Sequence, residues 1–432
     1  MALEAAIVLR RSACLAQLMR NEFLAPATLG ALRDRSLRAL VRHAASRVPF
    51  YRDLYAAQGV DAAAFNGLAD LPALPVVDKA LLREAGAAAV SIDAPADRVT
   101  ISTSGSTGEP FEFAIDRSYD QWRKAQYLRP YLSNGRRLVD KVLRLTAFPT
   151  LRSPWFSRLG LLREWQYDCG TDPARIAGAW RALEPQVLQG YPSSLRSLAH
   201  HCLERGESLE PAPRRVFTDS ELLTPGTRSL LEQAFRVPVI DVFGTYETDN
   251  IAYQCEAGGG YHVATDCVAL EIVRDGKPVP PGEEGELVVT VLANRTQPFI
   301  RYNLRDIGRL STEPCSCGRS FPVLSTISGR ADDLIVLADG RRRTAMDALG
   351  RIDRFVGEIR HYQFRQVGID RFELLIVPSA RFADAAAESI VRAAGSVLEG
   401  AEIEVRLVDA IPQDRSGKRR AFISLLENEG HA

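Results

Sequence analysis

Hydroxyl and glycine residues crowd one short stretch of the chain, Thr100 to Pro110, which reads T-I-S-T-S-G-S-T-G-E-P. Glycine lets a backbone approach a ligand closely, and Ser and Thr hydroxyls are small donors for oxyanions. The stretch therefore predicts a loop that holds phosphate groups. The alternative is a solvated hairpin turn, which has a similar composition.

The flanking residues argue against one class of nucleotide-binding loop. A P-loop reads G-x-x-x-x-G-K-[ST] and leads directly into a helix, whereas no lysine follows Gly108 here. Residues 111–116 alternate between apolar and polar, as a half-buried strand does. We therefore expect a strand, the loop and a second strand.

Two short clusters of cysteine and histidine have the residue types of a metal site. Cys255 and His262 form C-x6-H, and Cys315 and Cys317 form C-x-C. Three thiolates and one imidazole suit a tetrahedral Zn²⁺ with no open position, which is a structural site. Cys267 could replace one of these ligands, and ordinary buried cysteines are the alternative.

Composition limits the classes of partner. The 432-residue chain carries 54 basic and 54 acidic residues, a balance that favours neither nucleic acid nor a membrane surface as partner. No apolar run approaches ~18 residues, and residues 1–11 reach charged residues too early for a secretory signal. Seven cysteines without framework spacing predict thiols or metal ligands rather than disulfides. We expect a cytoplasmic protein that binds a small molecule.

Alternating strands and helices are expected in the middle of the chain. Residues 29–48 have apolar residues at helical spacing, and Pro49 ends that helix. Further along, β-rich pieces alternate with helical stretches, which is typical of βαβ units and a mostly parallel sheet. The pieces are 142–145, 186–188, 215–217 and 239–242, and the helices are 173–183, 193–205 and 225–235.

The pattern changes twice after residue 245. Two alternating apolar runs between 267 and 291 flank Gly/Pro-rich turns and predict a β-hairpin region. After Gly329 the pattern restarts as a helix, strands at 360–368 and 371–377, a helix at 382–399 and a strand at 402–408. The expected fold class is α/β. A large N-terminal domain (1–329) would hold mostly parallel sheets and the hairpin region, and a small α+β C-terminal lid domain would span 330–432.

Five motifs, in chain order, resemble the core motifs of adenylate-forming enzymes, most closely those of the phenylacetate-CoA ligase and CapK-like branch. They are TSGSTG at 103–108, DVFGTYE at 241–247, RYNLRD at 301–306, GRADD at 329–333 and SGK at 416–418. The N-terminal signature of that branch is matched by residues 40–43, 48–52 and 71–75. The resemblance implies that ATP activates a carboxylic acid as an acyl-adenylate with release of pyrophosphate. The acyl group would then pass to CoA or to a carrier-protein phosphopantetheine.

The resemblance also implies a nucleotide site. The phosphates would lie in a cradle formed by Thr103, Ser104, Gly105, Ser106, Thr107 and Gly108. Further nucleotide contacts would come from Ser220, Glu221, Asp241, Phe243, Gly244, Tyr246, Asp306 and Arg330. Phe243 would stack on adenine, and Asp306 would accept hydrogen bonds from the ribose hydroxyls. The alternatives are a core aromatic for Phe243 and a salt bridge to Arg305 or Arg309 for Asp306.

Lys418, Glu247 and Thr245 are the catalytic residues that the resemblance implies. Glu247 would hold Mg²⁺ against the phosphates, and a solvated loop glutamate is the alternative. Lys418 would bridge the substrate carboxylate and the α-phosphate. Only five of the 54 basic residues are lysines, which favours a specific role for Lys418 over a surface basic cluster. Asp332 would be the hinge of the lid.

Two segments depart from the family pattern. Residues 334–341 lack the Gly-Val-Asn-Val-Phe-Pro run of phenylacetate ligases. This difference bears on the predicted transfer of the acyl group to CoA more than on the predicted formation of the acyl-adenylate. Glu109-Pro110-Phe111 stands where many adenylating enzymes carry Pro-Lys, so the loop lacks a basic partner for phosphate.

The substrates and the acceptor stay open at this stage. Trp165, Tyr167 and Tyr191 lie where the family builds its acyl pocket and would suit an aromatic acid, although they could equally belong to the core. An acyl carrier protein and a dimer are both compatible with the resemblance. The rival functions are an adenylate-forming amide ligase with an amine acceptor and a non-catalytic nucleotide-binding homologue.

Overall fold

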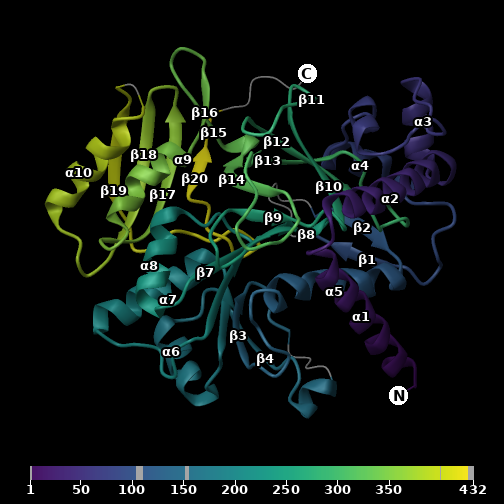
Figure 1. Ribbon diagram of the computed structural model, residues 1–432. Coiled ribbons are helices and arrows are strands. Elements are labelled where there is room, and N and C mark those ends of the chain that lie inside the picture. The colour runs from purple at the N-terminus through teal and green to yellow at the C-terminus, as the bar shows by residue number, and fades with distance from the viewer. Residues whose placement is uncertain (1, 104–109, 151–154, 399, 427–432) are drawn as a thin grey trace. The chain divides into compact units, whose positions relative to one another are not determined.

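The computed structural model describes residues 2–103, 110–150, 155–398 and 400–426, with the backbone alone at 2–7, 155, 332 and 384 (Figure 1). The chain divides into two compact units, each built from two segments. Residues 1–134 and 242–327 form the first unit, and 135–241 and 328–432 form the second. The predicted division at residue 329 into an N-terminal domain and a lid stays a prediction.

The first unit contains five helices and a mainly antiparallel sheet among its described residues. The helices are α1 (Ala2–Asn21), α2 (Pro26–Arg47), α3 (Pro49–Ala57), α4 (Lys79–Ala85) and α5 (Arg117–Leu132), with short 3-10 helices η1 (Leu68–Ala73) and η2 (Gly86–Ala89). The strands are β1 (Val99–Ser102), β2 (Glu112–Ile115), β8 (Asp249–Gln254), β9 (Tyr261–Val263), β10 (Val268–Arg274), β11 (Lys277–Pro278), β12 (Glu284–Val291) and β13 (Tyr302–Leu310). The chain passes between the units after Asn134, within β7 (Val239–Thr245) and within β14 (Val323–Arg330).

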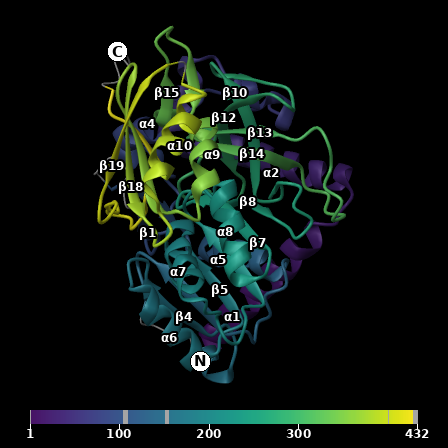
Figure 2. The ribbon, with the colours of Figure 1, turned by 90° about the vertical axis from the view of Figure 1, so that its left-hand side faces the viewer.

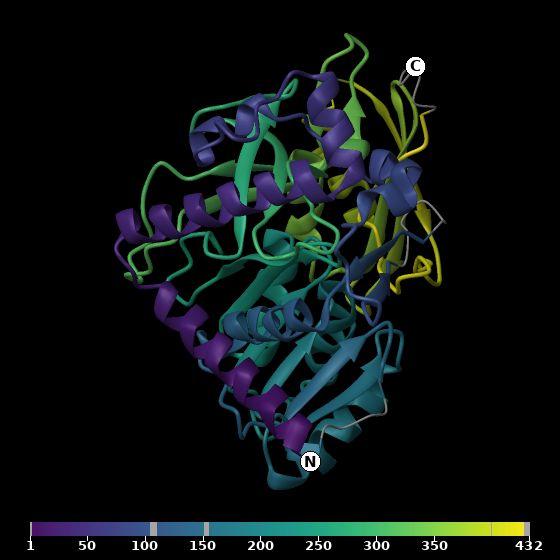
Figure 3. The same ribbon diagram turned by 90° about the vertical axis from the view of Figure 1, so that its right-hand side faces the viewer.

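Helix α2 covers one face of this sheet, as Figure 3 shows. Its buried residues Leu37, Leu40, Val41 and Ala44 share a core with Val268, Leu287 and Val289 of the strands. The predicted helix is confirmed: α2 ends at Arg47, and Pro49 opens α3, where its fixed φ suits the first helical position. The predicted hairpin region is also confirmed, because β10 pairs with β12 in antiparallel register from Val268 opposite Val291.

The βαβ prediction for the second unit is confirmed. Four parallel strands, in the order β6-β5-β3-β4, alternate with three helices. The strands are β3 (Val142–Thr146), β4 (Glu164–Asp168), β5 (Val187–Gly190) and β6 (Arg215–Asp219), and the helices are α6 (Pro173–Leu183), α7 (Pro192–Arg205) and α8 (Pro225–Phe235), with η3 (Trp155–Leu159) before β4. Strand β4 was not anticipated.

The C-terminal segment of the second unit is α+β, as predicted. Its sheet has the order β19-β18-β17-β20, and α9 and α10 bury apolar residues against one face of it (Figure 2). The elements are η4 (Ala331–Asp333), β15 (Leu334–Val336), β16 (Arg342–Thr344), α9 (Met346–Ile352), η5 (Asp353–Phe355), β17 (Ile359–Gly368), β18 (Arg371–Pro378), α10 (Asp384–Gly395), β19 (Glu402–Leu407) and β20 (Phe422–Ser424). The predicted fold class is confirmed. Within the described ranges, no helix combines the length and apolar character that a membrane span requires.

Candidate active site

The hydroxyl-rich loop joins two paired strands. β1 and β2 are antiparallel, with Ser102 opposite Glu112, so the predicted strand–loop–strand is confirmed. Thr103 is buried and closes the base of the loop: its amide donates to the Phe111 carbonyl at 2.9 Å, and its Oγ1 accepts from the Phe111 amide at 3.2 Å. Ser104, Gly105, Ser106, Thr107 and Gly108 lie outside the described residues.

Glu247 lies in a tight turn between β7 and β8. Thr245 Oγ1 and Thr248 Oγ1 are 3.0 Å apart and hold this turn together. Gly244 is required before it, because a Cβ there would lie 2.0 Å from the Asp249 carbonyl oxygen. The turn leaves Glu247 only 5 % exposed, so it is not a solvated loop glutamate.

The residues beside Glu247 have different environments. Tyr246 is exposed, while Phe243 is half-buried and packs against the core of the first unit. Part of the Phe243 side chain is therefore in contact with the core, and its stacking on adenine stays a prediction.

Lys79 contacts the Glu247 side chain, a contact that the sequence did not predict. Its Nζ lies 2.9 Å from Glu247 Oε1 and 5.8 Å from the centre of the Phe111 ring, just after the phosphate loop. The Tyr302 hydroxyl donates to the same carboxylate oxygen at 3.3 Å. Val77 positions Lys79, because its amide donates to the Arg301 carbonyl at 3.0 Å and its carbonyl accepts from the Asn303 amide at 2.8 Å.

Asp306 lies in an irregular part of β13. The register of β12 against β13 shifts between Glu286 and Val288, and Arg305 has a φ of 62°. The Arg305 guanidinium lies 4.0 Å from Glu286, and Arg309 donates to Ser325 at 3.4 Å. Asp306 is half-buried there.

Arg330 and Asp332 follow each other at the start of the C-terminal segment. Arg330 is half-buried at the end of β14, and the backbone of Asp332 lies in the 3-10 helix η4.

Three predicted nucleotide contacts follow or lie in β6 and β7 of the second unit. Asp241 Oδ1 accepts from Thr218 at 2.5 Å. Ser220 is exposed, has a φ of 73° and donates to Asp219 at 2.7 Å. Glu221 accepts from the Arg419 amide at 2.7 Å and from the amide and hydroxyl of Ser193, both at 2.9 Å. The Glu221 carboxylate therefore accepts hydrogen bonds from two other residues of the protein, Ser193 and Arg419, which the sequence did not predict.

Lys418 lies on a turn organised by Asp414. The Asp414 Oδ1 accepts from the amides of Ser416 and Lys418 at 2.8 and 3.0 Å and from the Ser416 hydroxyl at 2.6 Å. The Asp414 amide donates to the Lys418 carbonyl at 2.9 Å. This closed turn fixes the backbone of Lys418, and its side chain is half-buried.

The four predicted zinc ligands converge in the first unit. Cys255 follows β8, His262 lies opposite Tyr253 in β9, and Cys315 and Cys317 lie between β13 and β14. Their ligand atoms all lie within 4.8 Å of one another. Gly260 lets the chain before β9 lie close to β14, because its φ is 110° and a Cβ would lie 2.5 Å from the Leu324 carbonyl oxygen.

The cluster has the dimensions of a tetrahedral site. Zn–S bonds of ~2.3 Å place two sulfurs about 3.8 Å apart, and the Cys255 and Cys315 sulfurs are 3.6 Å apart. His262 Nε2 lies 3.4 Å from Cys255 Sγ and 3.2 Å from Cys317 Sγ. Burial lowers the pKa of His262 to about 4, so its imidazole is neutral, as a metal ligand must be. Cys267 instead lies against Arg129, whose Nη2 is 3.6 Å from its sulfur, and all seven cysteines are free of disulfides.

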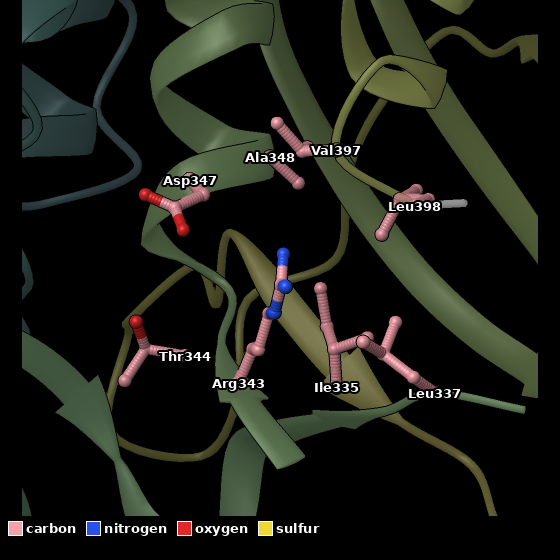
Figure 4. A pocket seen from close by; sticks show the side chains of 8 residues that line it. All are labelled: Ile335, Leu337, Arg343, Thr344, Asp347, Ala348, Val397 and Leu398. Atoms are coloured by element: carbon pink, nitrogen blue, oxygen red, sulfur yellow. The ribbon is translucent and has the colours of Figure 1, made fainter. Parts of the chain in front are cut away.

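The aromatic residues predicted to line an acyl pocket differ in their burial. Tyr191 is buried, and Tyr167 is half-buried against the core of the βαβ segment. A small pocket lies elsewhere, lined by residues of β15, β16 and α9 and by Val397 and Leu398 after α10; Arg343 and Asp347 are its charged lining residues (Figure 4). None of the predicted site residues lines that pocket.

Comparison with known proteins agrees with the motifs, although no family model matches the chain. Phenylacetate-coenzyme A ligase of Thermus thermophilus is 28 % identical over 340 residues, which cover 72 % of each chain. Protein CapK of Staphylococcus aureus is 24 % identical over 351 residues, covering 76 % of this chain and 74 % of CapK.

In fold, a crystal structure of 2-hydroxyisobutyryl-CoA ligase with 2-HIB-AMP superposes with a TM-score of 0.78 at 23 % identity, over 94 % of this chain and 92 % of that one. The fold is therefore that of the adenylate-forming ligases. In sequence the chain is similar to phenylacetate-CoA ligases and to CapK, and the resemblance predicted from its motifs is confirmed.

Proposed function

We propose that this protein is an AMP-forming acid–thiol ligase, which activates a carboxylic acid with ATP and transfers the acyl group to CoA. The observation that carries the proposal is the placing of Glu247. This buried carboxylate is held 2.9 Å from Lys79, whose ammonium lies over Phe111 at the end of the phosphate loop. A cation and a carboxylate that could hold Mg²⁺ thus meet beside Phe111, which follows the proposed phosphate loop in the chain.

In the first half-reaction, a carboxylate oxygen of the acid attacks the α-phosphorus of ATP. The bond from that phosphorus to the bridging oxygen breaks, and pyrophosphate leaves. Thr103 and the loop after it bind the leaving phosphates, and Lys418 offsets the negative charge that gathers between the carboxylate and the α-phosphate. Glu247 would hold Mg²⁺, which would neutralise phosphate charge.

In the second half-reaction, the thiol sulfur attacks the acyl carbon of the adenylate, and AMP leaves as the thioester forms. Lys418 must withdraw so that the thiol can enter, and Asp332 is the proposed hinge for that movement. Thr245 is a proposed catalytic residue beside Glu247. The proposed contacts to the nucleoside and its phosphate are Ser220, Glu221, Asp241, Phe243, Gly244, Tyr246, Asp306 and Arg330.

The proposal also includes a structural metal, a class of carboxylic acid, a cellular location and an alternative thiol. Cys255, His262, Cys315 and Cys317 would bind one structural Zn²⁺; the proposal is supported by three sulfurs and one imidazole nitrogen that lie within 4.8 Å of one another. The acid would be planar or aromatic if Trp165, Tyr167 and Tyr191 face it. The protein would act in the cytoplasm, as a monomer or a dimer, and a carrier-protein phosphopantetheine could replace CoA.

Nucleotide products test the proposed reaction. The protein is incubated with ATP, Mg²⁺ and a panel of aliphatic and aromatic carboxylic acids, with CoA, with an amine or with neither. We expect acid-dependent AMP and pyrophosphate, and a thioester only when CoA is present. ADP and orthophosphate would contradict the proposal, and amide formation without thioester would favour an amide ligase.

Lys79 should supply the basic phosphate partner that the loop lacks. We predict that Lys79→Met, which keeps the apolar stem but removes the ammonium, lowers kcat/KM for ATP about 10- to 100-fold, because one charge-assisted contact to phosphate is lost. The inhibition constant of pyrophosphate should rise in parallel, since the same group leaves with those phosphates. Both quantities follow from steady-state kinetics at saturating acid.

A matched control separates phosphate binding from the loss of an ion pair. Lys124 also pairs with a carboxylate, that of Asp120, but on the exposed side of α5. Lys124→Met should leave both constants unchanged. If Lys79→Met also leaves them unchanged, Lys79 only neutralises Glu247 and does not contact phosphate.

A further inference from the structure

Cys169 holds the turn that carries Lys418. Cys169 directly follows β4 and is buried, and its thiol donates to the Gly417 carbonyl at 3.4 Å. Gln413 Nε2 donates to the same sulfur at 3.5 Å. One side chain of the βαβ segment therefore bonds to residues on both sides of the Asp414–Ser416 stretch, within a single compact unit.

The fit at Gly417 is too close for any other residue. Gly417 has a φ of 75°, and a Cβ would lie 2.6 Å from Cys169 Sγ and 2.7 Å from the Ala147 Cβ. Contacts under 3 Å are repulsive, so only a bare Cα fits against the thiol. Close packing against Cys169, as well as hydrogen bonds, therefore holds the turn in place.

Glu221 fixes the residue on the other side of Lys418. Its carboxylate accepts from the Arg419 amide at 2.7 Å while it is itself held by the amide and hydroxyl of Ser193. The Arg419 guanidinium donates to the Ile411 carbonyl at 3.3 Å. The residues immediately before and after Lys418 are therefore both anchored.

We infer that Cys169 and Glu221 are positioning residues for Lys418, forming a latch that seats the lysine for adenylation and must open before the thiol can react. The inference rests on the proposed function, because it gives Lys418 its role. Substitution of Cys169 tests the positioning of Lys418 more directly than substitution of Glu221, because Glu221 is also a proposed nucleotide contact.

A double-mutant cycle tests the latch. Cys169→Leu places branched carbons where Gly417 must sit, and we expect acid-dependent ATP–pyrophosphate exchange to fall about 100-fold, as for a catalytic group displaced by about 1 Å. Thioester formation from a supplied acyl-adenylate should stay within twofold of wild type. Cys169→Ser, which is smaller and keeps a donor, should retain exchange.

The latch acts only through Lys418, so the two losses should not add. In a Lys418→Ala background, Cys169→Leu should cause no further loss of exchange. An additive loss, or an equal loss of both half-reactions, would overturn the inference and indicate a general structural role.

Thiol alkylation tests the latch without any need for activity. Burial, together with Asp168 and Glu221, raises the pKa of the Cys169 thiol, so iodoacetamide should modify it slowly while the turn is seated. Gly417→Val should increase the alkylation of Cys169 several-fold in peptide maps, with Cys202, a buried residue of α7, as an unchanged internal control. If Cys169 reacts equally fast in both proteins, there is no latch. A wild-type protein without exchange activity but with this protection would refute the proposed function and leave the latch standing.

Discussion

Replacing Lys418 with alanine should reduce acid-dependent ATP–pyrophosphate exchange about 100- to 1000-fold, the usual loss when one preorganised group is removed from a developing charge. Conversion of a supplied acyl-adenylate to its thioester should be nearly unaffected, because Lys418 must leave the site for that step. The two half-reactions are measured separately, by exchange of labelled pyrophosphate and by thioester formation from synthetic adenylate.

Two further variants sharpen this test. Lys418→Arg keeps the charge but presents a planar fork instead of a compact ammonium, so we expect little recovery of exchange. Lys277→Ala removes an exposed lysine from β11 and should leave both half-reactions unchanged. Equal loss of both half-reactions in Lys418→Ala would show that the lysine supports the fold rather than the chemistry.

Removal of zinc should have the largest effect on stability. Purified protein should contain about one equivalent of Zn²⁺, and extraction with a strong chelator should lower the midpoint of thermal unfolding by roughly 10 °C, since loss of a structural metal is among the few changes that cost more than about 4 kcal/mol. Added Zn²⁺ should restore the midpoint. Metal analysis and calorimetry give both quantities.

Ligand variants identify the site that binds the metal. Cys317→Ser should reproduce the loss of zinc and of stability, whereas Cys14→Ser, which changes a cysteine of α1 outside the cluster, should change neither. Zinc-free protein from zinc-supplemented cells, with a midpoint that does not respond to chelator, would contradict the assignment.

Local signals explain why some elements were predictable. The predicted bounds of α6 and α8 match the structure because each helix opens with a capping side chain and a proline: Asp172 before Pro173, and Thr224 before Pro225. Strand β4 was missed although Glu164 to Asp168 alternate polar and aromatic side chains, because it is a partly buried edge strand, whereas buried parallel strands are marked by apolar runs. No continuous apolar run marked it as a strand.

The site was predictable as a set of motifs but not as a set of contacts. Cysteine and histidine spacing identified the four residues whose ligand atoms lie within 4.8 Å of one another, because a metal demands particular residue types. The pair of Lys79 and Glu247 depends on the packing of Val77 against Arg301 and Asn303, which no local pattern reports. The scarcity of lysine, used only for Lys418, applied equally to Lys79 and could have identified it.

Oxygen transfer from the acid to AMP tests the central claim most directly. The acid that yields most AMP in the panel is labelled with ¹⁸O in its carboxylate, and the reaction is run with ATP and CoA. If the carboxylate attacks the α-phosphorus, one labelled oxygen stays with AMP when the thiol displaces it, so mass spectrometry should find AMP carrying one ¹⁸O. Unlabelled AMP, formed together with thioester, would contradict an acyl-adenylate intermediate.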